Sequence, residues 1–398
     1  MDDIRIGMYV AELDRPWVET PFLFQGFVIE DESVIDELRQ HCRYVFVDAE
    51  REDGTITVQT PMVAANQASV DRDSGSYPVD STAALRTELT IARDVHSEAQ
   101  QTVGTLFARV AKNEPLDLSA IENTIDPMID SIIRNEDAMS WLVRMRKKDD
   151  YIHSHSLSCS VWALVFGKHL NLEKRDLQTL ATGAMFLDVG KTQLPGELLS
   201  RPGKLVDNEL KLMRQHVAAG TKIVRRIRGL DSRVIEMVAH HHERHNGTGY
   251  PRGLRGNDIP VFARIAGIVD SYDAMTSARP YAKAISTFDA VRKLNKIAGV
   301  EFSEEMVEQF VQSIGIFPVG SLVELNTGEV GIVVAQNRIR RLRPKIMLIL
   351  DRNKQRLETH DMLDLRQQLT IGNASTSLWI ERGLTAGEYG IDPADYYL

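Results

Sequence analysis

The sequence has few cysteines, no excess of positive charge and no hydrophobic segment long enough to cross a membrane. Its two cysteines, Cys42 and Cys159, are too few for a disulfide framework or a zinc finger, which favours a reducing compartment. With 47 basic and 56 acidic residues, the formal net charge of −9 argues against a protein that binds duplex DNA through a basic face. No apolar run approaches the ~20 residues of a bilayer span. The first residues also lack the basic and apolar regions of a signal peptide, so we expect a cytoplasmic protein.

What the sequence does contain is typical of a folded protein with more than one domain. Apolar residues make up 43% and charged residues 26% of its 398 residues, and this length is usual for two or three domains. Residues 1–55 combine short β-prone runs with one helical stretch and predict a small β-rich module. Residues 56–80 are polar, show no apolar period and are interpreted as a linker.

A helical pattern begins after the linker. Residues 81–140 are interpreted as a helical connector. Its first helix, 83–112, either mediates dimerisation or signalling, or packs against the helices that follow. Ser119 and Glu122 have the capping-box spacing and predict the start of the next helix. Residues 141–317 hold at least five more helices, separated by segments that contain asparagine, glycine and proline.

After residue 317 the pattern alternates as in β-strands. Residues 321–334 predict a hairpin with a turn at 326–328, and residues 318–370 as a whole predict a small β-rich appendage. Residues 371–398 show no clear period and are interpreted as a C-terminal tail. The predicted fold is therefore mainly α, with a small β-rich module on each side of the helical region.

Histidines gather in the helical region. Eight of the eleven lie between positions 153 and 245. A buried imidazole needs a hydrogen-bond partner or a metal ion, because burial of a polar group without one is costly. So many imidazoles in one apolar helical region therefore point to a metal site or a catalytic site.

Helical spacing indicates which of these side chains face the interior. His241 and His242 share a face with two valines of the same predicted helix. His216 borders an apolar stripe that begins at Leu210. Asp188 extends the apolar stripe of the helix that precedes it.

In two places the spacing leaves a choice open. Asp270 and Asp273 both continue an apolar face, and His153 and His155 lie on two different apolar lines. A single buried histidine or aspartate is more often a hydrogen-bonded core residue than a ligand. Several imidazoles and carboxylates that converge in one helical bundle are more often a metal site. A mixed set of nitrogen and oxygen donors suits Fe or Mn better than Zn.

The order of these residues resembles that of a known family. The chain carries, in order, His155-Ser156, Leu187-Asp188-x-Gly190-Lys191, His216, His241-His242-Glu243, Gly249-Tyr250-Pro251 and Asp270. This order is similar to that of the HD-GYP family, bacterial cyclic-di-GMP phosphodiesterases of the HD phosphohydrolase superfamily. The resemblance covers about residues 140–317 and implies a helical-bundle HD-type domain. Residues 1–50 resemble a domain of unknown function that is often found ahead of HD-GYP domains.

The resemblance implies a metal-dependent cyclic-di-GMP phosphodiesterase that acts in second-messenger signalling. In such a centre, two divalent ions hold a hydroxide and clamp the phosphodiester. The implied metal ligands are His155, Asp188, His216, His241, His242 and Asp270. Asp188 bridges the two ions and is implied in catalysis. One ion takes the three histidines that follow Asp188 in the chain, and the other takes His155 and Asp270.

The resemblance also implies which residues contact the substrate. Lys191 would neutralise a phosphate oxygen as a point charge and take part in catalysis. Gly249, Tyr250 and Pro251 form a loop that shapes the pocket, with the Tyr250 ring available for stacking or hydrogen bonding. Arg279 is implied as a second phosphate contact.

Three positions depart from the family pattern. Leu187 stands where the family has the first histidine of its His-Asp pair, and leucine has no lone pair for a metal ion. Ala282 stands where the family often has arginine or lysine. Tyr151 stands where some members carry a glutamate that supports a third ion. We therefore expect one tightly held Fe or Mn ion, a second that is weak or absent, and no third.

The Leu187 departure keeps other interpretations open. One is a degenerate member that acts as a cyclic-di-GMP receptor or as a protein-interaction module with little turnover. Another is an HD-type hydrolase of a different nucleotide, which the retained Gly249–Pro251 motif disfavours. Other signalling proteins and a second copy of the chain are possible partners. The basic cluster 338–345 is better interpreted as a solvated hairpin edge than as a surface for nucleic acid or membrane.

Overall fold

The computed structural model describes residues 4–6, 8–13, 27–29, 32–42, 45–47, 81–145, 151–279, 282–337, 342–365, 370–371, 374–375 and 378–396. The chain divides into two compact units, Met1–Ser81 and Thr82–Leu398. No helix in the described ranges is long and apolar enough to span a membrane.

The first unit is a small sheet with one helix. Its elements are β1 (Tyr9–Leu13), β2 (Phe27–Val28), α1 (Glu32–His41) and β3 (Val45–Val47). The strands are antiparallel in the order β2-β1-β3, and Val10, Ile29 and Leu38 are fully buried in the core of this unit. Within the described residues, the three short strands and the single helix agree with the β-prone runs and the helical stretch that the sequence predicts. The predicted linker 56–80 lies outside the described residues.

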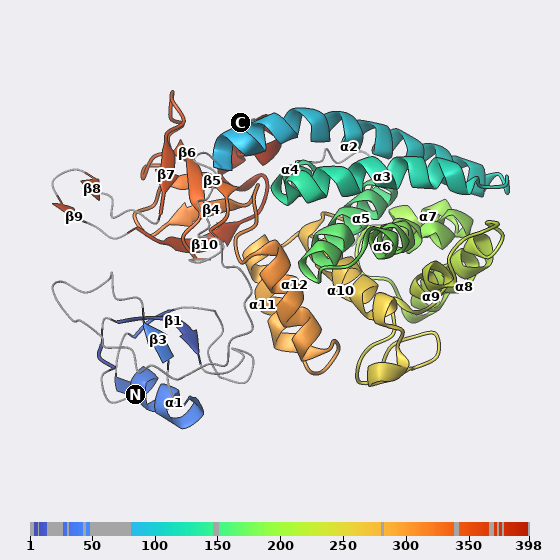
Figure 1. Ribbon diagram of the computed structural model, residues 1–398, viewed down its shortest axis with the longest axis horizontal. Coiled ribbons are helices and arrows are strands. Elements are labelled where there is room, and N and C mark those ends of the chain that lie inside the picture. Colours follow the sequence, from blue (N-terminus) through green and yellow to red (C-terminus); the bar gives the residue numbers. More distant parts are fainter. Residues whose placement is uncertain are drawn as a thin grey trace, which may run out of the picture. The chain divides into compact units, whose positions relative to one another are not determined.

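The second unit is mainly helical (Figure 1). Its α-helices are α2 (Ser81–Ala111), α3 (Leu118–Arg134), α4 (Glu136–Arg144), α5 (Tyr151–His169), α6 (Lys174–Phe186), α7 (Gly196–Ser200), α8 (Asp207–Val224), α9 (Ser232–His240), α10 (Val261–Thr276), α11 (Thr287–Ile297) and α12 (Glu304–Ile314). A short 3₁₀ helix, η3 (Val189–Gln193), follows α6. The mainly α fold that the sequence predicts is therefore confirmed.

The central helix of this unit is α5, because apolar side chains occupy most of its circumference. Trp162 and Phe166 are fully buried, and α5 packs against α4, α6, α10 and α12. A helix that is apolar on all faces is stable only in the interior. Its position lets α5 present His155 to several neighbouring helices.

Two local features of the helices differ from expectation. The first residue of α3 is Leu118, and the Asp117 side chain caps the helix by accepting a hydrogen bond from the Ser119 backbone N–H at 3.1 Å. Ser119 therefore lies inside the helix and is not its cap. Leu210, the predicted start of the α8 stripe, is 41% exposed. The buried residues of α8 begin only at His216, in the second half of the helix.

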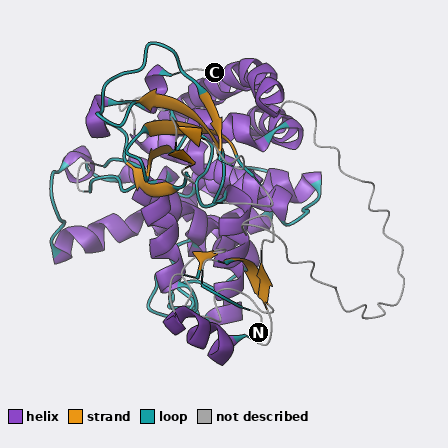
Figure 2. Ribbon diagram, turned by 90° about the vertical axis from the view of Figure 1, so that its left-hand side faces the viewer, coloured by secondary structure: helices purple, strands orange, loops and turns teal. Residues whose placement is uncertain are grey.

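The C-terminal part forms a five-stranded antiparallel sheet (Figures 1 and 2). Its strands are β4 (Leu322–Leu325), β5 (Val330–Ala335), β6 (Lys345–Leu350), β7 (Met362–Asp364) and β10 (Ile380–Leu384), in the order β10-β4-β5-β6-β7. The predicted hairpin corresponds to β4 and β5. β10 lies in the segment in which the sequence shows no clear period. Of its five residues only Leu384 is buried, so the strand has no alternation of buried and exposed residues that a sequence pattern could show. Residues 338–341 of the basic cluster lie outside the described residues. Another short antiparallel pair is formed by β8 (Thr370–Ile371) and β9 (Ala374–Ser375).

One hydrophobic core joins the helices and the sheet. Ile332 of the sheet and Ile391 near the C-terminus are fully buried in the same cluster as the helical core. The long helix α2 also belongs to this core. It runs along α3 (Figure 1), and Arg134 of α3 donates hydrogen bonds to the buried carboxylate of Glu88 at 2.8 and 2.9 Å. The first predicted helix therefore packs against the helices that follow it.

Candidate metal centre

Five segments of the second unit bring the predicted metal ligands together. α5 carries His155, the turn after α6 carries Asp188, and α8 carries His216. His241 ends α9 and His242 follows it, while α10 carries Asp270. Asp188 lies after the end of α6 at Phe186, so it occupies a turn and does not extend the helical stripe as expected.

The first cluster contains Asp188, His216, His241 and His242, whose ligand atoms all lie within 4.8 Å of one another. The Nε2 atom of His216 is 3.5 Å from Asp188 Oδ1 and 3.2 Å from His242 Nε2. The Nδ1 atoms of His216 and His241 face the backbone carbonyls of Met213 and Val238, at 2.6 and 3.0 Å. A carbonyl partner places the proton on Nδ1 and leaves the Nε2 lone pair free for a metal ion.

The second cluster contains His155, Asp188 and Asp270, again with ligand atoms within 4.8 Å of one another. His155 Nε2 is 3.1 Å from Asp270 Oδ1 and 3.4 Å from Asp188 Oδ2. The two oxygens of Asp188 therefore face different clusters. A carboxylate in this position is suited to bridge two ions.

The structure also decides between the residues that helical spacing left open. Asp273 is fully buried behind His155, and its carboxylate lies 2.7 Å from His155 Nδ1. Asp270 is therefore the aspartate of the second cluster, and Asp273 orients the imidazole. The His153 ring packs edge-on against Phe107 of α2 with ring centroids 5.2 Å apart, so it belongs to the packing of α2 on α5.

The unpaired polar atoms of the centre fit a metal ion. His241 Nε2 and Asp188 Oδ1 are buried and have no hydrogen-bond partner. Such atoms are rare because each costs about 1–3 kcal/mol when it is left unpaired. Four nitrogen and oxygen donors converge around them. These residues fit a divalent ion with mixed nitrogen and oxygen ligands.

Burial keeps the histidines neutral. It lowers the pKa of His241 to about 4 and lowers the pKa values of His216 and His242 as well. A neutral imidazole is the form that binds a metal ion. At neutral pH all three histidines are therefore ready to act as ligands.

The aspartates of the centre stay ionised. Burial alone would raise the pKa of Asp188, but the Lys191 ammonium, together with the neighbouring imidazoles of His155 and His216, outweighs it and lowers that pKa. Burial likewise opposes ionisation of Asp270, whose pKa is nevertheless lowered, chiefly by the hydrogen bond to His155. The centre thus presents anionic oxygens and neutral nitrogens.

Close backbone packing fixes the turn that carries Asp188. A Cβ atom on Gly190 would lie 1.9 Å from the carbonyl oxygen of His216 and 2.4 Å from the Gly220 backbone nitrogen. Only glycine allows η3 and α8 to approach this closely. This contact sets the separation between Asp188 and His216.

Leu187 lies directly before Asp188, at the C-terminal cap of α6, and is 1% exposed. It is part of the hydrophobic core. The second cluster therefore has three protein ligands within the described residues, and position 187 contributes packing in place of a donor atom.

Lys191 and Arg279 differ in how the structure places them. The Lys191 ammonium contacts Asp188 Oδ2 directly, at the edge of the second cluster. Arg279 lies beyond the end of α10, where its backbone N–H donates to the Ala282 carbonyl at 2.9 Å. The role of each in phosphate binding stays a prediction.

The loop at Gly249–Pro251 reaches the centre through its tyrosine. The Tyr250 ring stacks on His242 with ring centroids 4.7 Å apart. The Arg214 guanidinium of α8 lies 4.8 Å from the centroid of the same ring. Burial and the nearby aspartates raise the pKa of Tyr250, so its hydroxyl is a neutral hydrogen-bond donor at neutral pH.

Sequence reasoning missed Arg214. This residue contacts Tyr250 across 36 positions of chain, and it does not share a helical face with His216, two positions later. Sequence periodicity cannot predict a contact between a helix and a loop that is distant in the chain.

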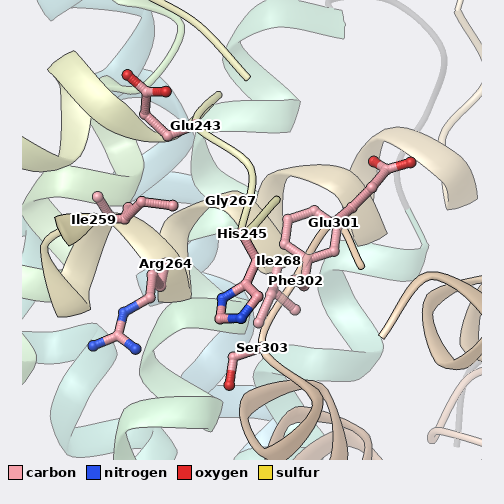
Figure 3. A pocket seen from close by; sticks show the side chains of 10 residues that line it. Glu243, His245, Ile259, Arg264, Gly267, Ile268, Glu301, Phe302 and Ser303 are labelled. Carbon is pink, nitrogen blue, oxygen red and sulfur yellow. The ribbon is translucent and has the colours of Figure 1, made fainter. Parts of the chain in front are cut away.

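A small cavity behind the loop is not a ligand site (Figure 3). Its volume is about 10 Å³, and Glu243, His245 and Arg264 are among its lining residues. This is the volume of about one water molecule. Glu243 itself anchors the loop, because its two carboxylate oxygens accept hydrogen bonds from the backbone N–H groups of Arg252 and Leu254, at 2.8 and 3.0 Å.

The fold and the site define an HD-type helical domain, and comparison with protein families agrees. Residues 135–305 match the HD domain model, residues 1–121 match a domain of unknown function (DUF3391), and residues 322–372 match a KOW domain associated with the HD domain. The chain belongs to the HD-GYP family.

Several known proteins are similar to this chain. A cyclic di-GMP phosphodiesterase of Pseudomonas aeruginosa is 30% identical over 345 residues, which are 86% of this chain and 82% of the relative. A cyclic di-GMP phosphodiesterase of Thermotoga maritima is 37% identical over 129 residues, 31% of this chain and 34% of the relative. Among solved structures, an HDG"Y"P protein from Bdellovibrio bacteriovorus has a TM-score of 0.48 at 18% identity, over 77% of this chain and 94% of that protein.

Proposed function

We propose that this protein is a metal-dependent phosphodiesterase that hydrolyses cyclic di-GMP. The observation that carries the proposal is the position of Asp188, whose two carboxylate oxygens face two different sets of nitrogen and oxygen donors. The long match to a phosphodiesterase of that name supports the choice of substrate. The acidic net charge does not oppose it, because the ions and Lys191 supply local positive charge.

The residues of the centre divide the work as follows. Divalent ions supply Lewis acidity, which makes water more acidic and stabilises charge on a phosphate. Asp188 would hold both ions, one through each carboxylate oxygen. Asp273 fixes the His155 ring, and the Lys191 ammonium lies beside Asp188, where it can meet a phosphate oxygen. The neutral Tyr250 hydroxyl is available to donate to the substrate at the mouth of the centre.

The donor set favours Fe or Mn, held unequally at the two positions. Asp188, His216, His241 and His242 provide four donors to the first. The second has His155, Asp188 and Asp270, and Leu187 adds none. The first ion would therefore be held tightly and the second weakly. This inequality is also what favours a second function, a cyclic-di-GMP receptor with slow turnover.

The test is turnover of cyclic di-GMP by the purified full chain under anaerobic conditions with Fe(II) or Mn(II). Metal content per chain is measured on the same samples. We expect metal-dependent cleavage to the linear dinucleotide or to GMP, abolished in Asp188→Asn. Binding of cyclic di-GMP without cleavage, at full metal occupancy, would identify a receptor instead. Absence of both binding and cleavage would contradict the proposed function.

A further inference from the structure

An open groove of about 530 Å³ is formed by α8, α9 and the loop after Tyr250. None of its lining residues is a predicted metal ligand, and none is acidic. Four are cationic: Lys222, Arg225, Arg226 and Arg252. Together they form what we call the basic groove.

No carboxylate of the described residues neutralises the charges of the basic groove. In the part of the chain that the structure describes, none of the four cationic side chains makes an ion pair. By contrast, Arg201, Arg233 and Arg244, on neighbouring segments, each face a carboxylate. The chain as a whole carries a net charge of −9, so unpaired cations gathered at one place are an exception.

This arrangement is unfavourable for folding alone. Lys222, Arg225 and Arg226 are spaced i, i+3 and i+4 at the end of α8, where like charges repel one another. The negative end of the helix offsets part of that repulsion. It does not account for Arg252, which comes from a different segment. An anion bound between the two segments would compensate all four charges.

The shape of the basic groove suits a small ligand. Its volume lies in the range of small-molecule sites, and Ala218 and Ala239 are short side chains that leave room for an anion. Its lining has no Phe, Tyr or Trp, and the one aromatic ring is the imidazole of His240, so it offers little surface on which a base could stack. The groove would therefore recognise a ligand by its negative charge. Guanidinium groups match the geometry of phosphate oxygens.

We propose that the basic groove binds a phosphate monoester dianion, at a site distinct from the metal centre. The dianion is either free phosphate or the terminal phosphate of a nucleotide. The groove adjoins the centre along the chain at three points. Val217 follows His216, His240 precedes His241, and Pro251 follows Tyr250. A bound phosphate therefore fixes the segments that position two histidine ligands and the stacked tyrosine.

The test compares the full metal-loaded chain with a variant that lacks two groove charges, Arg225→Gln/Arg226→Gln. The matched control is Arg86→Gln/Arg175→Gln, which removes the same charge from exposed arginines of α2 and α6. Calorimetric titration with inorganic phosphate forms one arm and titration with GMP the other. Binding of either probe to the metal ions is common to all three proteins. A difference between them therefore reports the groove.

We expect a phosphate-binding site in the wild type and the control whose affinity falls about tenfold or more in the groove variant, with unchanged metal content. Tighter binding of GMP than of phosphate would assign the site to nucleotides, and equal affinity would assign it to free phosphate. The same isotherms in all three proteins would overturn the proposal. If the double variant does not fold, as judged by circular dichroism, Arg252→Gln alone gives the same test.

Discussion

At the scale of single residues, the orientation of the His155 ring decides which aspartate joins the metal centre. His155, Asp188 and Asp270 meet as the motif order implies. The choice between Asp270 and Asp273 needs the structure, because both lie on buried turns of α10 and differ only in which nitrogen of His155 they face. Contacts of this kind depend on ring orientation, which no periodicity encodes.

Leu187→His restores the histidine that the family has at this position and tests whether its absence weakens the second metal site. Position 187 is buried beside Asp188, and histidine and leucine are similar in size, so the cost in stability should stay within about 1–3 kcal/mol. We expect metal content to rise towards two ions per chain and turnover to rise about ten- to a hundredfold, because a second Lewis acid is restored. Elemental analysis and steady-state kinetics measure both.

The control is Leu187→Met, which keeps an apolar side chain of similar volume and offers a weaker donor. It should leave metal content and turnover at the wild-type level. A folded Leu187→His protein with no additional metal would show that an imidazole at the end of α6 does not reach the second position.

Arg214→Met removes the cation from the ring of Tyr250 and keeps an unbranched side chain. A cation–π contact at an exposed site is worth about 0.5–1 kcal/mol. The KM for cyclic di-GMP should therefore rise about two- to fivefold, while metal content and kcat stay close to the wild type. Arg214→Lys should recover most of the loss. A larger effect on kcat than on KM would contradict a role in positioning the loop.

At the scale of elements, spacing predicts most of the helices but neither the turn at Asp188 nor the points at which elements approach closely. The segments that carry His216 and Asp188 were visible as separate elements. Their contact depends on the missing side chain of Gly190, which meets the backbone of α8. A close approach between two backbones depends on the tertiary structure. In the sequence it is visible only as a glycine, which does not show what that glycine contacts.

Gly190→Ala should separate η3 from α8 and disturb the metal centre. The new methyl group overlaps backbone atoms that cannot rotate away, so we expect a loss of at least about 1–3 kcal/mol of stability and a loss of bound metal. Urea denaturation and elemental analysis measure the two effects. Gly196→Ala is the control, since a Cβ there meets nothing within 4 Å. Equal behaviour of the two variants would contradict the packing argument.

Asp231 holds the start of α9, the helix that ends in the histidine ligands. Its carboxylate accepts a hydrogen bond from the Arg233 backbone at 2.9 Å, and the Arg233 side chain lowers the pKa of Asp231 to about 2. A lowered carboxyl pKa stabilises the folded state above the ordinary value of 3.8. That contribution is lost as the pH falls from about 4 to about 2.

Asp231→Asn should therefore destabilise the protein by the same amount at pH 5.5 and at pH 8, because Asp231 is fully ionised at both. Asparagine keeps the cap, so Asp231→Ala should cost about 1 kcal/mol more. Urea denaturation at the two pH values checks both statements. At pH 3 the cost of Asp231→Asn should be smaller than at pH 5.5, because part of the contribution is already lost there, and an equal cost at pH 3 and pH 5.5 would show that the pKa is not lowered.

At the scale of the whole molecule, the sequence separates modules that packing joins. The change from a helical to a β-strand pattern after residue 317 is real, yet the sheet shares one core with the helices. Ile391 belongs to that core although its segment shows no period, because isolated buried residues between turns leave no periodic trace. Hydrophobic contacts between modules join residues that are far apart in the sequence, so the local pattern of apolar and polar residues does not predict them.

Ile391→Ala should consequently lower the stability of the helices as well as that of the sheet. Truncation of a fully buried isoleucine costs about 2–5 kcal/mol. We expect the helical signal in circular dichroism to melt at a lower temperature in a single transition. Val300→Ala, at a 54% exposed position, is the control and should change little. An unchanged helical transition in Ile391→Ala would show that the sheet unfolds independently.

The helix α2 is assigned to different domains by family comparison and by packing. By family comparison it lies within the N-terminal match, which extends to residue 121, while by packing it belongs to the unit that carries the metal centre. Its 31 residues make a rod of about 46 Å. Near the far end of that rod, Phe107 packs on His153, two residues before His155, and the Val110 carbonyl accepts from Gln193 of η3. The family boundary at residue 121 therefore falls inside the packed unit, and the last turns of α2 support the segments that hold His155 and Asp188.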